Sequence, residues 1–186
     1  MKKIIVDVYA GSGAWSKYYK INGYDVRIIT LPENDANEFH PPDNVYGLLF
    51  APPCDQFSLV RNGCKTPRNF EKGLKEVKNC LRIIWECRLK NKLAFWCLEN
   101  PTGLLRQFLG KPVFTFQPYH YGDYYSKKTD LWGYFNNPKK TPLGPLEKEL
   151  VNRKFIESIG GNNDEKKAKR SVTPAGFARA FYEANK

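Results

Sequence analysis

KIIVDVYAGSG, residues 3–13, is the stretch that decides the fold of this chain. Its apolar, β-branched part, Lys3–Ala10, ends in Gly11-Ser12-Gly13, and Ala14–Ile21 then has the character of a short helix. A short apolar run bounded by glycines is typical of a buried strand. A strand that leads through a tight glycine turn into a helix is typical of α/β proteins.

The same alternation continues along the chain. Further strands are predicted at Tyr24–Leu31, Val45–Ala51, Leu93–Leu98, Val113–Phe116 and Leu131–Phe135. Apolar residues recur at three- and four-residue spacing over Arg68–Leu89, which predicts a helix there. A closing helix is predicted at Pro174–Asn185, with Thr173 as its cap. This order predicts an α/β fold with a doubly wound, mostly parallel sheet covered by helices.

Composition and length fit one globular domain. The 186 residues are 41% hydrophobic and 15% aromatic, which excludes wholesale disorder. We divide the chain into a core at 1–138, a loop-rich insert at 139–170 and a closing segment at 171–186 that packs back on the core.

The sequence predicts neither export nor a metal site. Asp7 interrupts the apolar start after three residues, and runs such as Leu48-Leu49-Phe50-Ala51 are too short to cross a membrane. Five cysteines without a CxxC pair, with only two histidines, form neither a disulfide framework nor a zinc pattern. We therefore expect a soluble cytoplasmic protein with no membrane association and no metal.

The charge points to a polyanionic partner. The net charge is +11, and Arg61–Lys92 alone holds ten Lys or Arg against three Glu. Such an excess favours nucleic acid, although a solvated helix face would explain it equally well.

Three unusual segments follow predicted strands. They are Gly11-Ser12-Gly13, Pro52-Pro53-Cys54 and Glu99-Asn100-Pro101. In doubly wound folds, ligands bind beyond the carboxyl ends of the strands. These segments are therefore expected to meet at one ligand site.

Two of these segments carry reactive groups. Cys54 is either a small buried hydrophobe or a nucleophile whose pKa is lowered by positive charge in the loop that follows. Glu99 ends an apolar strand, so its pKa should be raised, as a proton donor requires. The alternative is that Glu99 only caps its loop. Cys80, Cys87 and Cys97 are expected to be structural, and Cys64 is undecided.

The ordered set of motifs resembles the cytosine-5 DNA methyltransferase family. Asp7-Val8-Tyr9-Ala10-Gly11-Ser12-Gly13 looks like its DxFxGxG motif, Pro53-Cys54 with Phe57-Ser58 like PCQxFS, and Glu99-Asn100 like ENV. Asp55 and Pro101 replace the usual Gln and Val. The likeness is greatest to the short enzymes of bacteriophages and prophages. It covers most of residues 4–135 and resumes at 171–185.

The resemblance implies a Rossmann-like, S-adenosylmethionine-dependent methyltransferase fold that methylates carbon 5 of cytosine in DNA, either single-stranded or flipped out of a duplex. It implies that Cys54 is the nucleophile and Glu99 the acid at ring nitrogen 3. The implied contacts to S-adenosylmethionine are Asp7, Tyr9, Ala10, Gly11, Gly13, Thr30, Leu31, Asp35, Pro52, Thr173 and Pro174. The implied DNA contacts are Ser58, Arg61, Lys65, Arg68, Lys127 and Lys128. It also implies the cytoplasm of a bacterial host as the location, and a phage as a source.

Residues 139–173 are too few for a full target-recognition domain, which predicts short or poor sequence specificity. The sequence does not indicate an oligomeric state. The second strand ends without the acidic residue that the family uses for the cofactor ribose, and Glu33 is the nearest substitute. Two other functions stay open. The chain could be an inactive relative that only binds DNA, or a cytosine methyltransferase that acts on RNA or on a free nucleotide.

Overall fold

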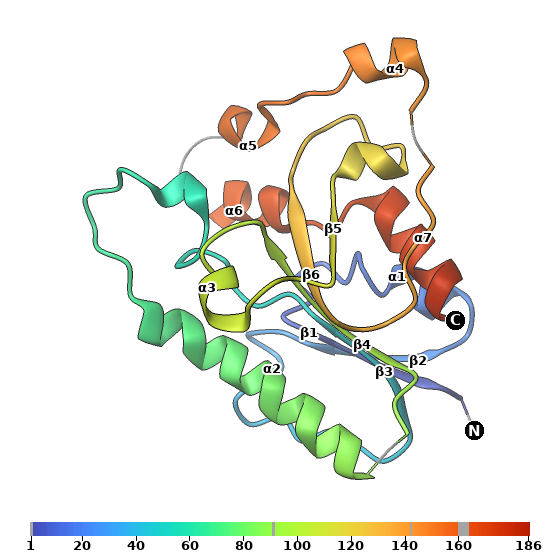
Figure 1. Cartoon of the computed structure of the whole chain (residues 1–186). Helices are drawn as coiled ribbons and strands as arrows, with labels where there is room; N and C mark the ends of the chain where they lie inside the picture. Colours follow the sequence, from blue (N-terminus) through green and yellow to red (C-terminus); the bar gives the residue numbers. More distant parts are fainter. Residues whose placement is uncertain (1, 91, 142, 160–163) are drawn as a thin grey trace.

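The fold is built around one six-stranded sheet. The computed structural model describes residues 2–90, 92–141, 143–159 and 164–186. Its strands are β1 (Ile4–Val8), β2 (Asp25–Ile29), β3 (Val45–Phe50), β4 (Phe95–Pro101), β5 (Phe114–Phe116) and β6 (Thr129–Tyr134), in the order β2-β1-β3-β4-β6-β5 (Figure 1). The strands from β2 to β4 are parallel to one another, whereas β6 runs antiparallel to both β4 and β5.

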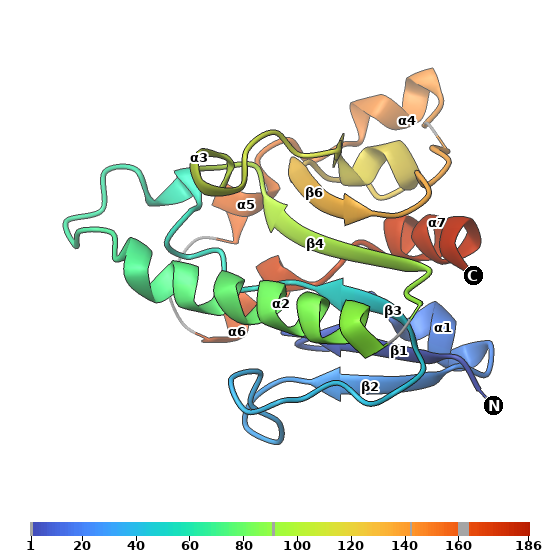
Figure 2. The same cartoon turned by 60° about the horizontal axis from the view of Figure 1, so that its bottom comes forward.

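Helices cover both faces of this sheet. The long helix α2 (Phe70–Lys90) lies across one face, and α1 (Lys17–Ile21) and α7 (Ala175–Asn185) lie on the other (Figure 2). The remaining helical segments are short: η1 (Leu59–Arg61), α3 (Arg106–Leu109), η2 (Pro118–Tyr121), α4 (Pro145–Glu149), α5 (Phe155–Ser158) and α6 (Asp164–Ser171).

The alternation of side chains in the strands separates two cores. In β1, Val6 and Val8 pack with Val77 and Ile83 of α2. Ile5 points to the opposite face, where aromatic side chains of α1 and α7 gather. Because successive residues of a strand face opposite sides, Asp7 lies on the same face as Ile5.

Most expected elements are present. The α/β class, all six strands and helix α2 are confirmed within a few residues. The sheet is mixed, however, because β6 enters between β4 and β5 in the antiparallel sense. The same pairing carries β4 past its expected end at Leu98, since Glu99 lies opposite Leu131 and Asn100 opposite Asp130.

The cap expected for the closing helix is wrong. Helix α7 begins at Ala175, with Pro174 rather than Thr173 at the N-cap position and no capping bond from that side chain. The carboxylate of Asp123 takes over this role, because its Oδ2 accepts a hydrogen bond from the backbone N–H of Gly176 at 3.1 Å. The cap thus comes from a distant part of the chain.

The expected insert at 139–170 contains the short helices α4, α5 and most of α6. Residues 142 and 160–163, which include Gly160-Gly161, lie outside the described residues. Within the part of the chain that the structure describes, no helix is both long enough and apolar enough to span a bilayer.

Candidate active site

The glycine turn follows β1, where the order of the strands in the sheet reverses. β1 has β2 on one side and β3 on the other, and in such sheets a ligand site opens beyond the carboxyl ends of the strands at this point. Tyr9 follows β1 with a left-handed φ of 58°, and Gly11 and Gly13 have φ values of 53° and 67°. A turn of three left-handed residues leaves its backbone accessible, and the strain at Tyr9 is typical of functional sites.

Asp7 is a buried carboxylate without a hydrogen-bond partner. It is 1% exposed, and neither carboxylate oxygen has a partner among the described residues. Burial raises its pKa to about 7, although the nearby hydroxyl and amide of Ser16 oppose this rise. An orphaned carboxylate beside an open turn fits a positively charged ligand group.

We expect Asp7→Asn to remove a pH dependence of stability. A carboxyl whose pKa rises from 3.8 to about 7 on folding binds more protons in the folded state. Its unfavourable contribution therefore grows as the pH rises from about 4 to 7, and a shift of about three units corresponds to about 4 kcal/mol. The unfolding free energy of Asp7→Asn, measured by urea denaturation, should fall less than that of the wild type between pH 4 and 8.

The exposed Asp43→Asn is the matched control and should follow the wild type across this pH range. If Asp7→Asn and the wild type lose stability in parallel, the carboxylate is not buried as an unpartnered charge.

The Cys54 loop and the segment that contains Glu99 are joined by hydrogen bonds. Asn100 donates its side-chain N–H to the carbonyl of Pro52 at 3.0 Å, and its Oδ1 has no partner among the described residues. The backbone N–H of Leu104 donates to the carbonyl of Phe57 at 2.9 Å. A Cβ atom on Gly103 would collide with that same carbonyl, so glycine is required there. These contacts hold the two candidate catalytic segments together.

Cys54, Glu99 and Lys127 form one electrostatic cluster. The Nζ of Lys127 lies 4.0 Å from Oε1 of Glu99, and their side chains are only 8% and 14% exposed. Burial raises the pKa of the Cys54 thiol, the charge of Lys127 opposes this rise, and Glu99 adds to it. Burial likewise raises the pKa of Glu99, against the effect of Lys127. The expectation of a raised Glu99 pKa is thus confirmed.

The expected lowering of the Cys54 pKa is wrong, because burial raises this pKa. Arg61 and Arg68 do not figure among the main influences on it, and their guanidinium groups bind within their own loop. Arg68 donates to the carbonyls of Gln56 and Ser58 at 2.8 and 2.9 Å, and Arg61 donates to Oε1 of Gln56 at 2.8 Å. Both arginines therefore brace the loop, and Lys127 is the cation that acts on the thiol.

The two neighbouring lysines are placed differently. Lys127 is buried beside Glu99, whereas Lys128 is exposed. Their backbone is held in place, since the N–H of Thr102 donates to the carbonyl of Lys128 at 2.8 Å. Both lysines were expected as DNA contacts. The burial of Lys127 beside Glu99 could not be predicted from the sequence, because it depends on the long-range pairing of β4 with β6.

Helix α2 connects the glycine turn with the Asp35 loop. The hydroxyl of Tyr9 donates to Oε2 of Glu76 at 2.7 Å. Asn79, one turn further, donates to Oδ1 of Asn37 at 2.9 Å. Asn37 in turn donates its backbone and side-chain N–H groups to Asp35, and these hydrogen bonds lower the pKa of Asp35. The sequence carried no signal for these two residues of α2.

The other residues expected at the site lie on nearby segments. Thr30 and Leu31 directly follow β2, with Thr30 half-buried and Leu31 exposed. Pro174 is buried directly before α7, and Phe177 in the first turn of that helix packs against Trp15 with ring centroids 6.0 Å apart.

Ser58 caps η1, since its hydroxyl accepts from the N–H of Val60, and Lys65 is exposed beyond it. Cys80, Cys87 and Cys97 are buried, and Cys64 is exposed.

No protein-family model matches this chain, and no curated protein is significantly similar to it. The family resemblance therefore rests on short motifs.

Proposed function

We propose that this protein transfers a methyl group from S-adenosylmethionine to carbon 5 of cytosine in DNA, through a covalent adduct with Cys54. One observation carries the proposal. A thiol, a carboxyl of raised pKa and a buried lysine converge from three separate segments at one edge of the sheet. The proposal takes the fold to be the methyltransferase variant of the doubly wound type.

The residues around the glycine turn fit the cofactor. When bound, S-adenosylmethionine supplies an electrophilic methyl group on a positively charged sulfur, and its amino acid end carries an ammonium group. The buried, unpartnered carboxylate of Asp7 offers a counter-charge for such a ligand. The left-handed turn exposes its backbone for close approach. The other proposed contacts are Tyr9, Ala10, Gly11, Gly13, Thr30, Leu31, Asp35, Pro52, Thr173 and Pro174.

Cys54 and Glu99 make carbon 5 of the cytosine ring reactive toward the methyl group. Carbon 5 of cytosine is a poor nucleophile. When Cys54 loses its proton and its sulfur bonds to carbon 6, the electrons of the carbon 5–carbon 6 double bond make carbon 5 nucleophilic. Burial raises the pKa of Glu99, which favours its protonated form; in that form Glu99 donates a hydrogen bond to ring nitrogen 3 and offsets the developing charge. As the methyl group passes to carbon 5, S-adenosylhomocysteine leaves. A base then removes the carbon 5 proton, the carbon 5–carbon 6 double bond re-forms, and the sulfur–carbon bond breaks to release the thiolate.

Lys127 favours the thiolate of Cys54. Burial raises the pKa of this thiol, and the lysine charge acts in the opposite direction. The same charge helps to stabilise the negative charge that forms as the sulfur adds to the ring. We therefore assign Lys127 to the reaction centre, together with Cys54 and Glu99.

DNA contacts are proposed around this centre. A duplex covers the face of the cytosine ring, so the base has to be flipped out or presented in a single strand. Lys65 and Lys128 are exposed and available to phosphates. Arg61 and Arg68 keep the loop beside Cys54 in shape, and Ser58 begins its helical turn.

Methyl transfer tests this proposal directly. The protein should transfer labelled methyl groups from S-adenosylmethionine to a long, random-sequence DNA pool, and digestion should yield labelled 5-methyldeoxycytidine. Parallel reactions with single-stranded DNA, RNA of the same sequences and free cytidine nucleotides distinguish the substrates. Labelled RNA or nucleotide in place of DNA would identify one of the alternatives. Binding of cofactor and DNA without any methyl transfer would support the inactive DNA-binding protein.

A further inference from the structure

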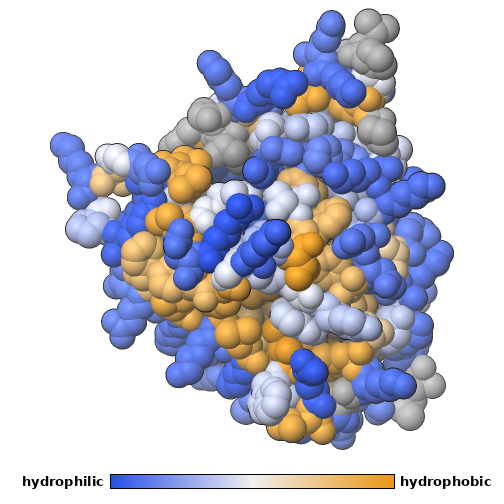
Figure 3. Space-filling view, viewed as in Figure 1, coloured by the Kyte–Doolittle hydropathy of each residue, from blue (hydrophilic) through white to orange (hydrophobic). Residues whose placement is uncertain are grey.

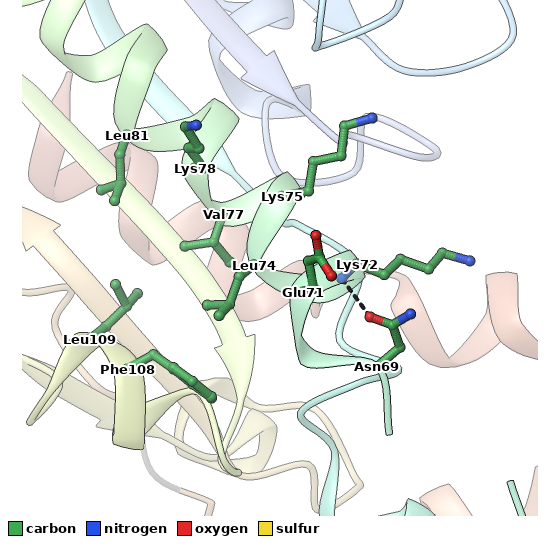
Figure 4. Close-up of a pocket in the computed structure, with 10 residues that line it drawn as sticks. All are labelled: Asn69, Glu71, Lys72, Leu74, Lys75, Val77, Lys78, Leu81, Phe108 and Leu109. Atoms are coloured by element: carbon green, nitrogen blue, oxygen red, sulfur yellow. Dashed lines mark hydrogen bonds between the residues drawn. The ribbon is translucent and has the colours of Figure 1, made fainter. Parts of the chain in front are cut away.

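A groove lies between α2 and α3. Its volume is about 1020 Å³, and its apolar lining comes from Leu74, Val77 and Leu81 of α2 and from Phe108 and Leu109 of α3. Figure 4 shows the aliphatic side chains of α2 pointing toward Phe108 and Leu109 across the groove. The two helices thus leave an apolar channel between them.

Exposed apolar side chains extend this channel along α2. Leu81, Trp85 and Leu89 are 45%, 62% and 70% exposed, and they follow one another at four-residue spacing on one side of the helix. Phe108 on α3 is 43% exposed. Figure 3 shows apolar surface gathered over α2 and α3 on this side of the molecule. Contiguous exposed apolar surface of this kind marks interaction sites on soluble proteins.

The edge of the groove is positively charged. Lys72, Lys75 and Lys78 line it and extend outward in Figure 4, with Glu71 as its one acidic lining residue. None of these three lysines makes a salt bridge to another of the described residues. An apolar floor with a free cationic edge is complementary to a ligand that is apolar on one side and acidic on its flanks.

We propose that this groove is a docking site for an acidic amphipathic helix of a partner protein. A helix laid into a two-helix groove uses apolar anchors at i, i+3, i+4 and i+7, and acidic residues on its flanks would face the lysines. The stretch from Leu74 to Leu89 is about 22 Å long at 1.5 Å per residue. It accommodates a partner helix of about four turns.

Charge and chemistry exclude two other occupants. A second copy of this chain also carries +11, so two of these lysine-edged faces would repel one another. Single-stranded nucleic acid binds through bases stacked on aromatic rings. Among the described residues, Phe108 is the one aromatic residue in the lining of the groove and Trp85 lies beyond it, so the surface offers no series of adjacent rings for successive bases.

A fluorescein-labelled synthetic peptide tests the docking site. The probe is a helix of four turns with Leu at i, i+3, i+4 and i+7 and Glu on the flanks. We expect saturable binding by fluorescence anisotropy, weakened at least tenfold by Leu81→Glu and also by Lys75→Glu/Lys78→Glu. A scrambled peptide of the same composition should not bind. The matched controls are Ile21→Glu and Lys17→Glu/Lys20→Glu, at exposed residues of α1, and they should bind as the wild type does.

Three results would overturn the proposal. The first is a lack of binding by the acidic peptide, or binding that survives Leu81→Glu. The second is tight binding of an unstructured DNA oligonucleotide that only the lysine variants lose, which would assign the face to nucleic acid. The third is a dimer in sedimentation that Leu81→Glu dissociates, which would assign it to a second copy. Circular dichroism confirms that each variant is folded.

Discussion

Cys54→Ser should form no complex with 5-fluorocytosine DNA that survives denaturing electrophoresis, whereas the wild-type protein should form one in the presence of S-adenosylmethionine. Fluorine at carbon 5 cannot leave as a cation. The adduct between sulfur and carbon 6 therefore persists once the methyl group has been transferred. A serine hydroxyl is a far weaker nucleophile than a thiolate at neutral pH, so the expected loss is complete.

The other cysteines provide matched controls for this experiment. Cys64→Ser, at an exposed thiol, should be trapped as the wild type is. The buried Cys80, Cys87 and Cys97 should likewise be dispensable for trapping in variants that fold. Glu99→Gln should slow trapping by about 10² to 10⁴, the range for a lost general acid. Trapping that persists in Cys54→Ser would contradict the proposed chemistry.

Lys127→Met should slow trapping at pH 7 by about 10² to 10³, the effect of removing one group that stabilises a developing charge. The lysine opposes the rise in the pKa of Cys54 that burial causes. Without it the thiol pKa rises further, so the trapping rate should continue to increase to a higher pH than in the wild type. The measurement is the trapping rate at saturating DNA between pH 6 and 9, with Lys127→Arg expected to retain part of the activity.

The adjacent, exposed Lys128 is the control for Lys127. Lys128→Met should leave the trapping rate at saturating DNA unchanged. It should reduce the slope of log affinity against log salt by about one unit if the side chain contacts a phosphate. Equal effects of the two variants on trapping would show that Lys127 has no special place beside Cys54.

Local patterns were sufficient for most of the secondary structure. The run KIIVDV followed by Gly11-Ser12-Gly13 predicts both β1 and its turn, because a buried strand and a left-handed glycine turn depend mainly on nearby residues. The amphipathic spacing over Arg68–Leu89 predicts α2 for the same reason. A raised pKa of Glu99 also followed from the sequence, since its neighbours in β4 are apolar.

Contacts between segments far apart in the sequence could be identified only from the tertiary structure. Strand β6 pairs antiparallel with β4, and this pairing extends β4 through Glu99 to Pro101. No local pattern in the sequence specifies which strand will lie beside β4. The cap of α7 at Asp123 and the bonds from α2 to Tyr9 and Asn37 are of the same kind. The sequence placed the positive charge near Cys54 on the following loop, where Arg61 and Arg68 instead bind their own backbone.

The sequence by itself determined the strands, the glycine turn and the order of the three motif segments at the strand ends, because periodicity and turn chemistry are local properties. Only the tertiary structure decided that Lys127 lies buried beside Glu99, that Asp7 has no partner, and that α2 and α3 leave an apolar groove. Burial and charge proximity depend on which surfaces pack together. That choice is made by the whole chain, so residues far apart in sequence decide the ionisation of Cys54 and Glu99.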